Sequence, residues 1–244
     1  MSASGEAWKS DALVHTYLES VRGGIPLARE QIDVLLRLAE ARGATVESIA
    51  DLGCGNGILS MALLDRYPDA VATLVDHSKP MISEARSHLA AYAGKCDFIT
   101  TDLSEHKWVR SLGDAGGFDV VVSGYAIHHL SDARKRQLYG EIFGLLEPGG
   151  LFVNTEHVGS PTEWVERISD DLLIDSLYTH QTAHGSDKTR EQVAVDFVHR
   201  PDKVANILAP VESQCEWLRD CGFQDVDCYL KIFEFAMFGG RRPL

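Results

Sequence analysis

Short apolar runs alternate with helical patterns through the middle of the chain. Five runs, nearly continuous in Val, Ile, Leu, Ala and Phe, read as buried strands: residues 48–53, 70–76, 96–102, 118–124 and 150–156. Apolar residues recur at helical spacing in three intervening stretches: residues 58–67, 81–92 and 131–146. In the last of these we expect Asp132 at the helix cap. This alternation predicts a parallel sheet covered by helices on both faces.

Two helices are predicted ahead of this region. The first has apolar residues at helical spacing within residues 13–21, and a break at residues 22–26 follows it. Pro26 suits the first turn of the second helix, whose pattern stops near Gly43. These helices are also the surface through which we expect a homodimer to form.

The pattern changes after residue 156. Residues 161–200 are predicted to be helical and polar, and an amphipathic helix follows at 211–221. The runs 223–230 and 232–240 alternate as two adjacent antiparallel strands do. We therefore expect an α/β fold with a Rossmann-like, seven-stranded sheet that is mostly parallel and contains a C-terminal antiparallel strand.

Composition and net charge limit the kinds of partner and the compartment that we expect. The net charge of −13 disfavours a nucleic-acid partner, because binding to phosphates rests on Lys and Arg. We expect the small basic cluster at residues 134–136 to be solvated. Five cysteines without CxxC spacing, and an N-terminus without an apolar leader, favour a cytoplasmic protein with reduced thiols. No apolar run approaches the ~18 residues of a membrane span, so we expect no membrane partner.

The most informative stretch is residues 51–57, DLGCGNG, where the first core strand meets its helix. Its glycines let the backbone pass close to a ligand. Asp76 and Asp102 end the next two strands at the same edge of the sheet. Such a group of carboxylates suits hydroxyl groups and a cation better than a pyrophosphate. The missing Lys-Ser/Thr after the glycines excludes a P-loop.

Five segments in this order resemble the motifs of the class I S-adenosylmethionine-dependent methyltransferases, including UbiE-like domains. They are DLGCGNG, LVDHSKPMI, ITTDL, FDVVVSGYAIHHLSD and LLEPGGLFVNTE, all within residues 49–156. The resemblance implies S-adenosyl-L-methionine as cofactor and S-adenosyl-L-homocysteine as product. It also implies a set of cofactor-binding residues: Asp51, Gly53, Cys54, Gly55, Asn56, Gly57, Asp76, His77, Met81, Thr101, Asp102, Leu103, Ser123 and Gly124.

In that family Asp76 would hold the ribose, and Asp102 with Leu103 would border the adenine amino group. A single domain over residues 1–244 then has four parts: N-terminal helices (1–45), a cofactor-binding core (46–156), a helical insert or lid (157–210), and a C-terminal helix with its strand pair (211–244).

Methyl transfer needs alignment of the acceptor, and a general base only when the acceptor is protonated. The candidate catalytic residues are His128, His129 and Glu156, just beyond the fourth and fifth core strands; packing is the alternative role for either histidine. Histidines of the insert are further candidates for substrate contact. His180 and His184 have helical spacing without a clear third ligand, so we expect no metal.

Within the superfamily, a closer resemblance runs to carboxy-S-adenosylmethionine synthase. It rests on Arg22–Pro26, the insert, and the segment 211–240. That synthase binds its extra carboxylate with an arginine where this chain has Trp217, with Arg219 as an alternative two positions later. We therefore favour a methyltransferase that acts on a small-molecule acceptor at O, N, S or activated C. The synthase and a non-catalytic cofactor-binding module are the alternatives.

Overall fold

The computed structural model describes residues 22–113, 116–199, 203 and 206–244. The predicted helix within residues 13–21 lies outside these residues, and with it part of the surface expected to form a homodimer. No helix of the described residues is long and apolar enough to cross a membrane.

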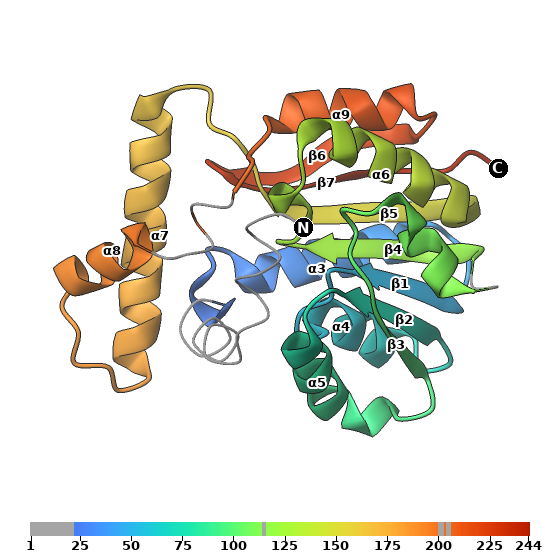
Figure 1. Cartoon of the computed structure of the whole chain (residues 1–244), viewed down its shortest axis with the longest axis horizontal. Coiled ribbons are helices and arrows are strands. Elements are labelled where there is room, and N and C mark those ends of the chain that lie inside the picture. Colours follow the sequence, from blue (N-terminus) through green and yellow to red (C-terminus); the bar gives the residue numbers. More distant parts are fainter. Residues whose placement is uncertain (1–21, 114–115, 200–202, 204–205) are drawn as a thin grey trace.

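Seven strands form one sheet in the order β3-β2-β1-β4-β5-β7-β6 (Figure 1). Their bounds are β1 Ser48–Leu52, β2 Val71–Asp76, β3 Cys96–Thr100, β4 Phe118–Gly124, β5 Leu146–His157, β6 Gln224–Ile232 and β7 Phe235–Arg241. The first five strands pair in parallel, and β7 is antiparallel to both β5 and β6. The predicted fold class is confirmed.

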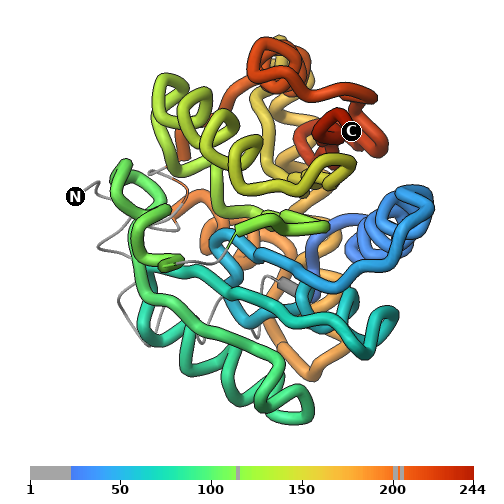
Figure 2. Tube along the Cα trace, turned by 90° about the vertical axis from the view of Figure 1, so that its right-hand side faces the viewer, coloured from blue at the N-terminus to red at the C-terminus, as the bar shows by residue number. Residues whose placement is uncertain are grey.

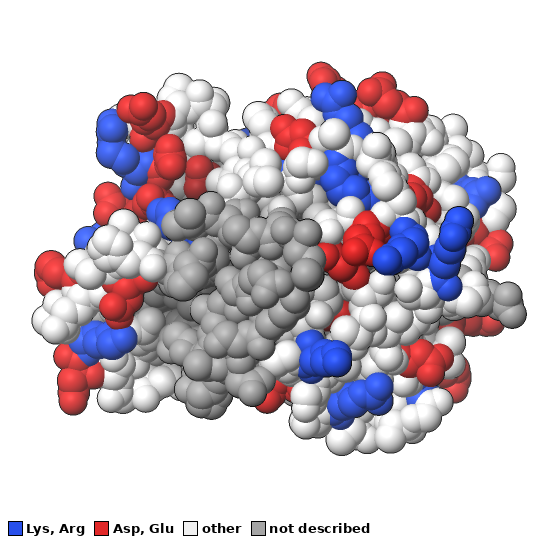
Figure 3. Space-filling model, in the orientation of Figure 1, with Lys and Arg blue, Asp and Glu red and all other residues white. Residues whose placement is uncertain are grey.

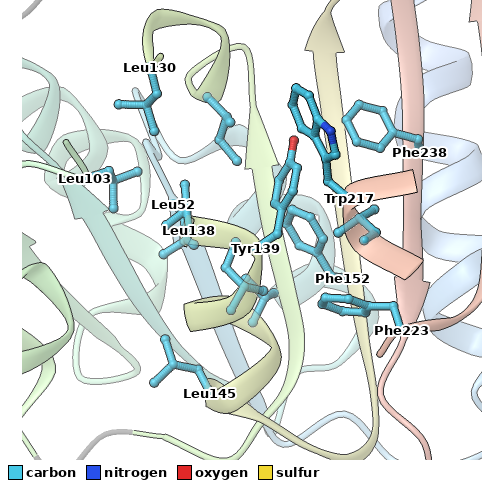
Figure 4. Close-up of a cluster of buried hydrophobic side chains, with 14 of the residues drawn as sticks. Leu52, Leu103, Leu130, Leu138, Tyr139, Leu145, Phe152, Trp217, Phe223 and Phe238 are labelled. Carbon is cyan, nitrogen blue, oxygen red and sulfur yellow. The ribbon is translucent and has the colours of Figure 1, made fainter. Parts of the chain in front are cut away.

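Helices cover both faces of the sheet (Figure 2). One face packs against three of them, α3 Ala28–Ala41, α4 Ile58–Arg66 and α5 Lys79–His88. The other packs against α6 Asp132–Leu145 and α9 Val211–Asp220. Alternate residues of one strand serve the two cores: Val120 and Val122 of β4 face the first, and Val121 faces the second. Both cores are apolar, and Figure 4 shows the second.

Two helices, α7 Glu163–Ala183 and α8 Arg190–Val198, lie beyond the carboxyl ends of the parallel strands (Figure 1). We call this pair the lid. Leu173 and Leu177 of α7 pack with Phe197 of α8 in a third apolar cluster. Ile25 and Phe235 belong to the same cluster, so the lid is attached to the sheet by apolar contacts.

Two helix starts differ from their predictions. The helix predicted to begin around Pro26 starts at Ala28, after Leu27 with a left-handed φ of 58°. The cap of α6 is Ser131, whose side chain accepts a hydrogen bond from the Arg134 amide; Asp132 is the first helical residue. The hydroxyl satisfies an unpaired backbone donor of the first turn.

The expectation of a solvated basic cluster at 134–136 is wrong for two of its residues. Arg134 and Lys135 are buried, and only Arg136 is exposed. Lys135 donates to Asp132 at 2.9 Å and to the carbonyl of Ile207. Neighbouring carboxylate and carbonyl groups therefore compensate for the burial of these cations. Figure 3 shows Lys and Arg interspersed with Asp and Glu on the face that it displays.

Candidate active site

Three glycines shape the loop between β1 and α4. Gly53, Gly55 and Gly57 have positive φ angles of 70°, 54° and 77°, a conformation that costs a residue with a Cβ about 1–2 kcal/mol. A Cβ at Gly53 would also overlap the Cβ of Ala126, just beyond β4. The loop thus lies between β1 and β4, where the strand order reverses and open α/β sheets bind ligands.

Asp76, the last residue of β2, holds this loop by its carboxylate. Its Oδ2 accepts a hydrogen bond from the Gly55 amide at 3.0 Å, and Oδ1 accepts one from the Ser78 amide at 2.8 Å. Burial raises the pKa of Asp76, against the opposing effects of His77 and these amides. Each carboxylate oxygen has a further lone pair, so Asp76 can also accept hydrogen bonds from a ligand's hydroxyl groups.

The space beside the loop has two features that fit a ligand. A Cβ at Gly55 would meet only the Sδ of Met81, at 4.0 Å, among the described residues. The Nε2 atom of His77 is buried and has no hydrogen-bond partner within the described part of the chain. The Asn56 carbonyl, by contrast, is engaged by the Nδ1 of His88 at 3.0 Å.

Three other predicted residues, Asp51, Cys54 and Ser123, lie in the loop or in the strands that adjoin it. Asp51 Oδ2 accepts from the Ser60 hydroxyl at 2.8 Å, and the Ser123 hydroxyl donates to the Leu52 carbonyl at 2.7 Å. Burial, followed by the carboxylates of Asp76 and Asp51, raises the pKa of Cys54 well above its usual value, so the thiol stays protonated. Their contact with a ligand stays a prediction.

The end of β3 completes this side of the site. The Thr101 amide donates to the Asp76 carbonyl at 3.0 Å. Asp102 Oδ1 accepts from the Ser104 amide at 2.8 Å, and Leu103 is buried. We call the loop Gly53–Gly57, together with Asp76 and residues 101–103, the glycine side.

Two of the predicted catalytic residues, His128 and Glu156, meet just beyond β4 and at the end of β5. His128 Nδ1 lies 2.5 Å from Glu156 Oε1, and the His128 amide donates to Oε2 at 2.9 Å. Burial raises the pKa of Glu156 from 4.5 to about 7, opposed by the His157 amide and by the charges of His129, His157 and Lys135. The ring centroid of His129 lies 4.0 Å from that of His128.

A second imidazole–carboxylate pair adjoins the first. His157 Nε2 lies 2.9 Å from Glu234 Oε2, and the His157 amide donates to Glu156 Oε1 at 2.9 Å. Burial opposes ionisation of Glu234, but the hydrogen bonds from its neighbours, that of His157 first, and the charge of His157 together outweigh burial and lower its pKa. No pattern in the sequence points to Glu234, which lies in the hairpin between β6 and β7, 77 positions after its partner.

Tyr125, the first residue after β4, has a φ of 54°, unusual for a bulky side chain. Its hydroxyl donates to Gln31 Oε1 at 3.1 Å and accepts from Gln31 Nε2 at 2.8 Å. Its amide donates to the Thr155 carbonyl at 2.8 Å. Strain of this kind costs about 1–3 kcal/mol and clusters at functional sites. We call Tyr125, residues 128–129, residues 156–157 and Glu234 the histidine side.

The predicted histidines of the insert have other surroundings. The His180 ring packs against Gly23, where a Cβ would overlap it, and His184 Nδ1 lies 2.8 Å from the His180 carbonyl. His199 is exposed. In the described part of the chain, no group of three or more His, Cys, Asp or Glu residues is arranged to hold a metal ion.

Neither Trp217 nor Arg219 reaches the site. Trp217 is buried in the core beside Tyr139 and Phe238 (Figure 4). Arg219 donates to the Val226 carbonyl at 3.0 Å. Val226 lies near the start of β6, whereas Glu234 follows the end of that strand. Arg219 therefore lies at the other end of the strands from Glu234. The alternative that Arg219 binds a carboxylate of the cofactor is wrong.

Comparisons with known proteins concern the domain and the fold. A family model described as a methyltransferase domain matches residues 49–150. The carboxy-S-adenosyl-L-methionine synthase of Helicobacter hepaticus is 23% identical over 243 residues, which cover 96% of this chain and 93% of that protein.

Two solved structures have a similar fold. The PH0226 protein from Pyrococcus horikoshii has a TM-score of 0.61 at 18% identity, covering 94% of this chain and 99% of its own. The magnesium protoporphyrin IX methyltransferase from Synechocystis, solved with bound SAH, has a TM-score of 0.54 at 17% identity, covering 87% of this chain and 82% of its own. Residues 49–150 therefore form a methyltransferase domain, and the seven-stranded sheet has the Rossmann-like fold of class I S-adenosylmethionine-dependent methyltransferases.

Proposed function

We propose that this protein transfers the methyl group of S-adenosylmethionine to a small-molecule acceptor. The observation that carries the proposal is the hydrogen bond from the Gly55 amide to Asp76, at 3.0 Å, in a glycine loop at the switch point of the sheet. It supports a donor site that joins an open backbone cradle to a carboxylate with lone pairs to spare.

The residues of the glycine side fit this cofactor. Asp76 would accept from the ribose hydroxyls, and Asp102 from the adenine amino group. Gly55 would let the backbone approach the methionine part, since a Cβ there meets only Met81 at 4.0 Å among the described residues. The buried Nε2 of His77 would be a polar neighbour of the adenine.

Bound S-adenosylmethionine supplies an electrophilic methyl group on a sulfonium. In our proposal, the histidine side handles the proton of the acceptor. With Nδ1 of His128 held 2.5 Å from Glu156, Nε2 would take the proton of an acceptor hydroxyl, amine or thiol. Glu156 is then a positioning residue that fixes the tautomer and ring orientation of His128.

Two observations favour a small acceptor. The lid lies beyond the carboxyl ends of the strands (Figure 1), a position from which it could exclude water around a small molecule. The net charge of −13 disfavours nucleic acid. We also propose that the protein works in the cytoplasm, because all five cysteines are free thiols, as suits a reducing compartment.

Calorimetric titration with S-adenosylhomocysteine tests the donor site. Wild-type protein should bind it, and Asp76→Ala should weaken binding by about 1–3 kcal/mol, the scale of a lost charged hydrogen-bond partner. Asp69→Ala, which removes an exposed carboxylate near the start of β2, is the control. An unchanged affinity in Asp76→Ala would overturn the ribose assignment.

Assays of S-adenosylhomocysteine release with a panel of small acceptors test methyl transfer itself. His128→Gln should lower kcat for acceptors that must lose a proton and leave cofactor affinity near the wild-type value. If His128→Gln and wild-type protein turn over such acceptors equally, His128 is not the base.

A carboxy-S-adenosylmethionine synthase is the second candidate, favoured by a relative of that name that matches 96% of this chain. Against it, Trp217 and Arg219 offer no cation to a carboxylate at the site. Mass spectrometry of the cofactor retained through purification separates the two functions. Carboxylated cofactor would favour the synthase, and unmodified cofactor the methyltransferase.

A further inference from the structure

Arg134 on α6 reaches across to the loop that follows β3. Its Nε donates to the Leu103 carbonyl at 2.8 Å. Its Nη1 and Nη2 donate to the two carboxylate oxygens of Glu141, at 3.0 and 2.7 Å. The guanidinium is buried, with 7% of the side chain exposed. A planar, bidentate geometry of this kind needs arginine and is not reproduced by lysine.

Glu141 ties the same loop region to α6 a second time. Its Oε2 accepts from the indole nitrogen of Trp108 at 2.5 Å, and Oε1 lies 3.4 Å from Nδ1 of His106. Burial opposes ionisation of Glu141, but the Arg134 and Trp108 hydrogen bonds prevail and lower its pKa. Trp108 is itself fully buried. Arg134 and Glu141 together therefore clamp residues 103–108 onto α6.

The clamp holds the residues that carry two hydrogen-bond acceptors after β3, the Leu103 carbonyl and the Asp102 carboxylate. Because the Leu103 carbonyl accepts from a guanidinium, it is fixed in direction beside Asp102. Asp102 Oδ1 is held by the Ser104 amide at 2.8 Å. That hydrogen bond engages Oδ1 and leaves Oδ2 of Asp102 able to accept from a ligand.

We propose that Arg134 is a positioning residue that makes the donor site selective for a 6-amino purine over a 6-oxo purine. This inference rests on the proposed donor site. A 6-amino group donates to Asp102, whereas a 6-oxo group would bring an acceptor against a carboxylate and leave both unpaired. This selectivity requires that the clamp hold residues 103–108 in place. If they could rotate, backbone amides could face the purine in place of the Asp102 carboxylate.

Calorimetry with S-adenosylhomocysteine and its 6-oxo analogue, S-inosylhomocysteine, tests the inference. Wild-type protein should prefer the 6-amino compound. Arg134→Met should bind S-adenosylhomocysteine about tenfold more weakly, the scale of a lost charged hydrogen bond, and its preference over the 6-oxo compound should fall by a similar factor. Arg134→Lys should recover the preference only in part.

Arg136→Met is the matched control, since Arg136 is exposed on the same helix and its guanidinium lies 4.6 Å over the Trp217 ring. If Arg134→Met does not fold, Glu141→Gln tests the same clamp, because it neutralises the carboxylate without changing its shape.

A folded variant that binds with wild-type preference between the two purines would overturn the role of Arg134 and leave the donor site standing. A wild-type protein that binds neither compound would overturn the proposed function, and this inference with it.

Discussion

The two sides of the site are built from different parts of the chain. On the glycine side, the contacts are local or between neighbouring strands, and backbone amides supply most of them: the Gly55 and Ser78 amides on Asp76, and the Ser104 amide on Asp102. On the histidine side, side chains far apart in the sequence pair with one another. His128 and Glu156 are 28 positions apart, and His157 and Glu234 are 77 apart.

This difference suggests a division of work. A backbone cradle changes little when side chains change, which suits a cofactor common to many enzymes. Buried side-chain pairs depend on their exact partners, which suits an acceptor particular to one enzyme. The two sides meet where Gly53 packs against Ala126, next to the strained Tyr125.

The largest effect is expected from Gly53→Ala. A Cβ there would overlap the Cβ of Ala126 at a φ of 70°, so strain and overpacking together should cost about 4 kcal/mol of unfolding free energy in urea titrations. Gly43→Ala is the control, with a φ of 72° and no atom within 4 Å of its Cβ among the described residues, and should cost about 1 kcal/mol. Equal losses would mean that the junction of the two sides is loosely packed.

The next effect is a pH dependence on the histidine side. The pKa of Glu156 in the folded protein is about 7, above its ordinary 4.5. Folded protein therefore binds the extra proton more tightly, and this stabilisation is full below pH 4.5 and lost as the pH rises through 7.

Glu156→Gln cannot titrate. The unfolding free energy of wild type minus that of Glu156→Gln should therefore fall by about 2.5 kcal/mol between about pH 5 and pH 8 in urea titrations. Glu84→Gln, an exposed change on α5, is the control. Parallel pH curves for wild type and Glu156→Gln would remove the case for a buried, titrating carboxyl.

Glu234→Gln tests the second pair. Losing the charge that His157 contacts at 2.9 Å should cost about 2 kcal/mol near neutral pH. Because the pKa of Glu234 is lowered, this cost should shrink as the pH falls below the ordinary range of a carboxyl. Exposed Glu216 on α9 supplies the control, Glu216→Gln. A cost that stays constant into acid would mean that shape, not charge, holds the pair.

The smallest effect is expected from Tyr125→Phe, which removes the hydroxyl bonded to Gln31 at 2.8 and 3.1 Å. We expect a loss of about 1 kcal/mol in thermal or urea unfolding. Affinity for S-adenosylhomocysteine should stay within about twofold of wild type. A larger loss of cofactor affinity would show that the two sides are not separable.

The parts of the site predicted from sequence are those fixed by local spacing. Residues 51–57 contain their own turn signal, Asp76 ends a strand that its apolar pattern predicts, and Asp102 follows such a strand by two residues. The helix starts predicted at Pro26 and Asp132 were wrong, because a helix start depends on which residue takes the capping conformation, and neighbouring residues compete for it. The prediction that Arg134 and Lys135 are solvated was wrong, because a run of charged residues does not show which distant groups will pack around it.

By itself, the sequence determined the succession of strands and helices along the chain, the glycine loop and the carboxylates near the strand ends. Periodicity and turn chemistry act over only a few residues, so they can be read without the fold. Only the tertiary structure decided that Glu156 meets His128, that Glu234 meets His157, and that Arg134 holds the Leu103 carbonyl. Each of those contacts joins segments brought together by sheet order and helix packing, and a buried polar group is stable only where the fold delivers its partner.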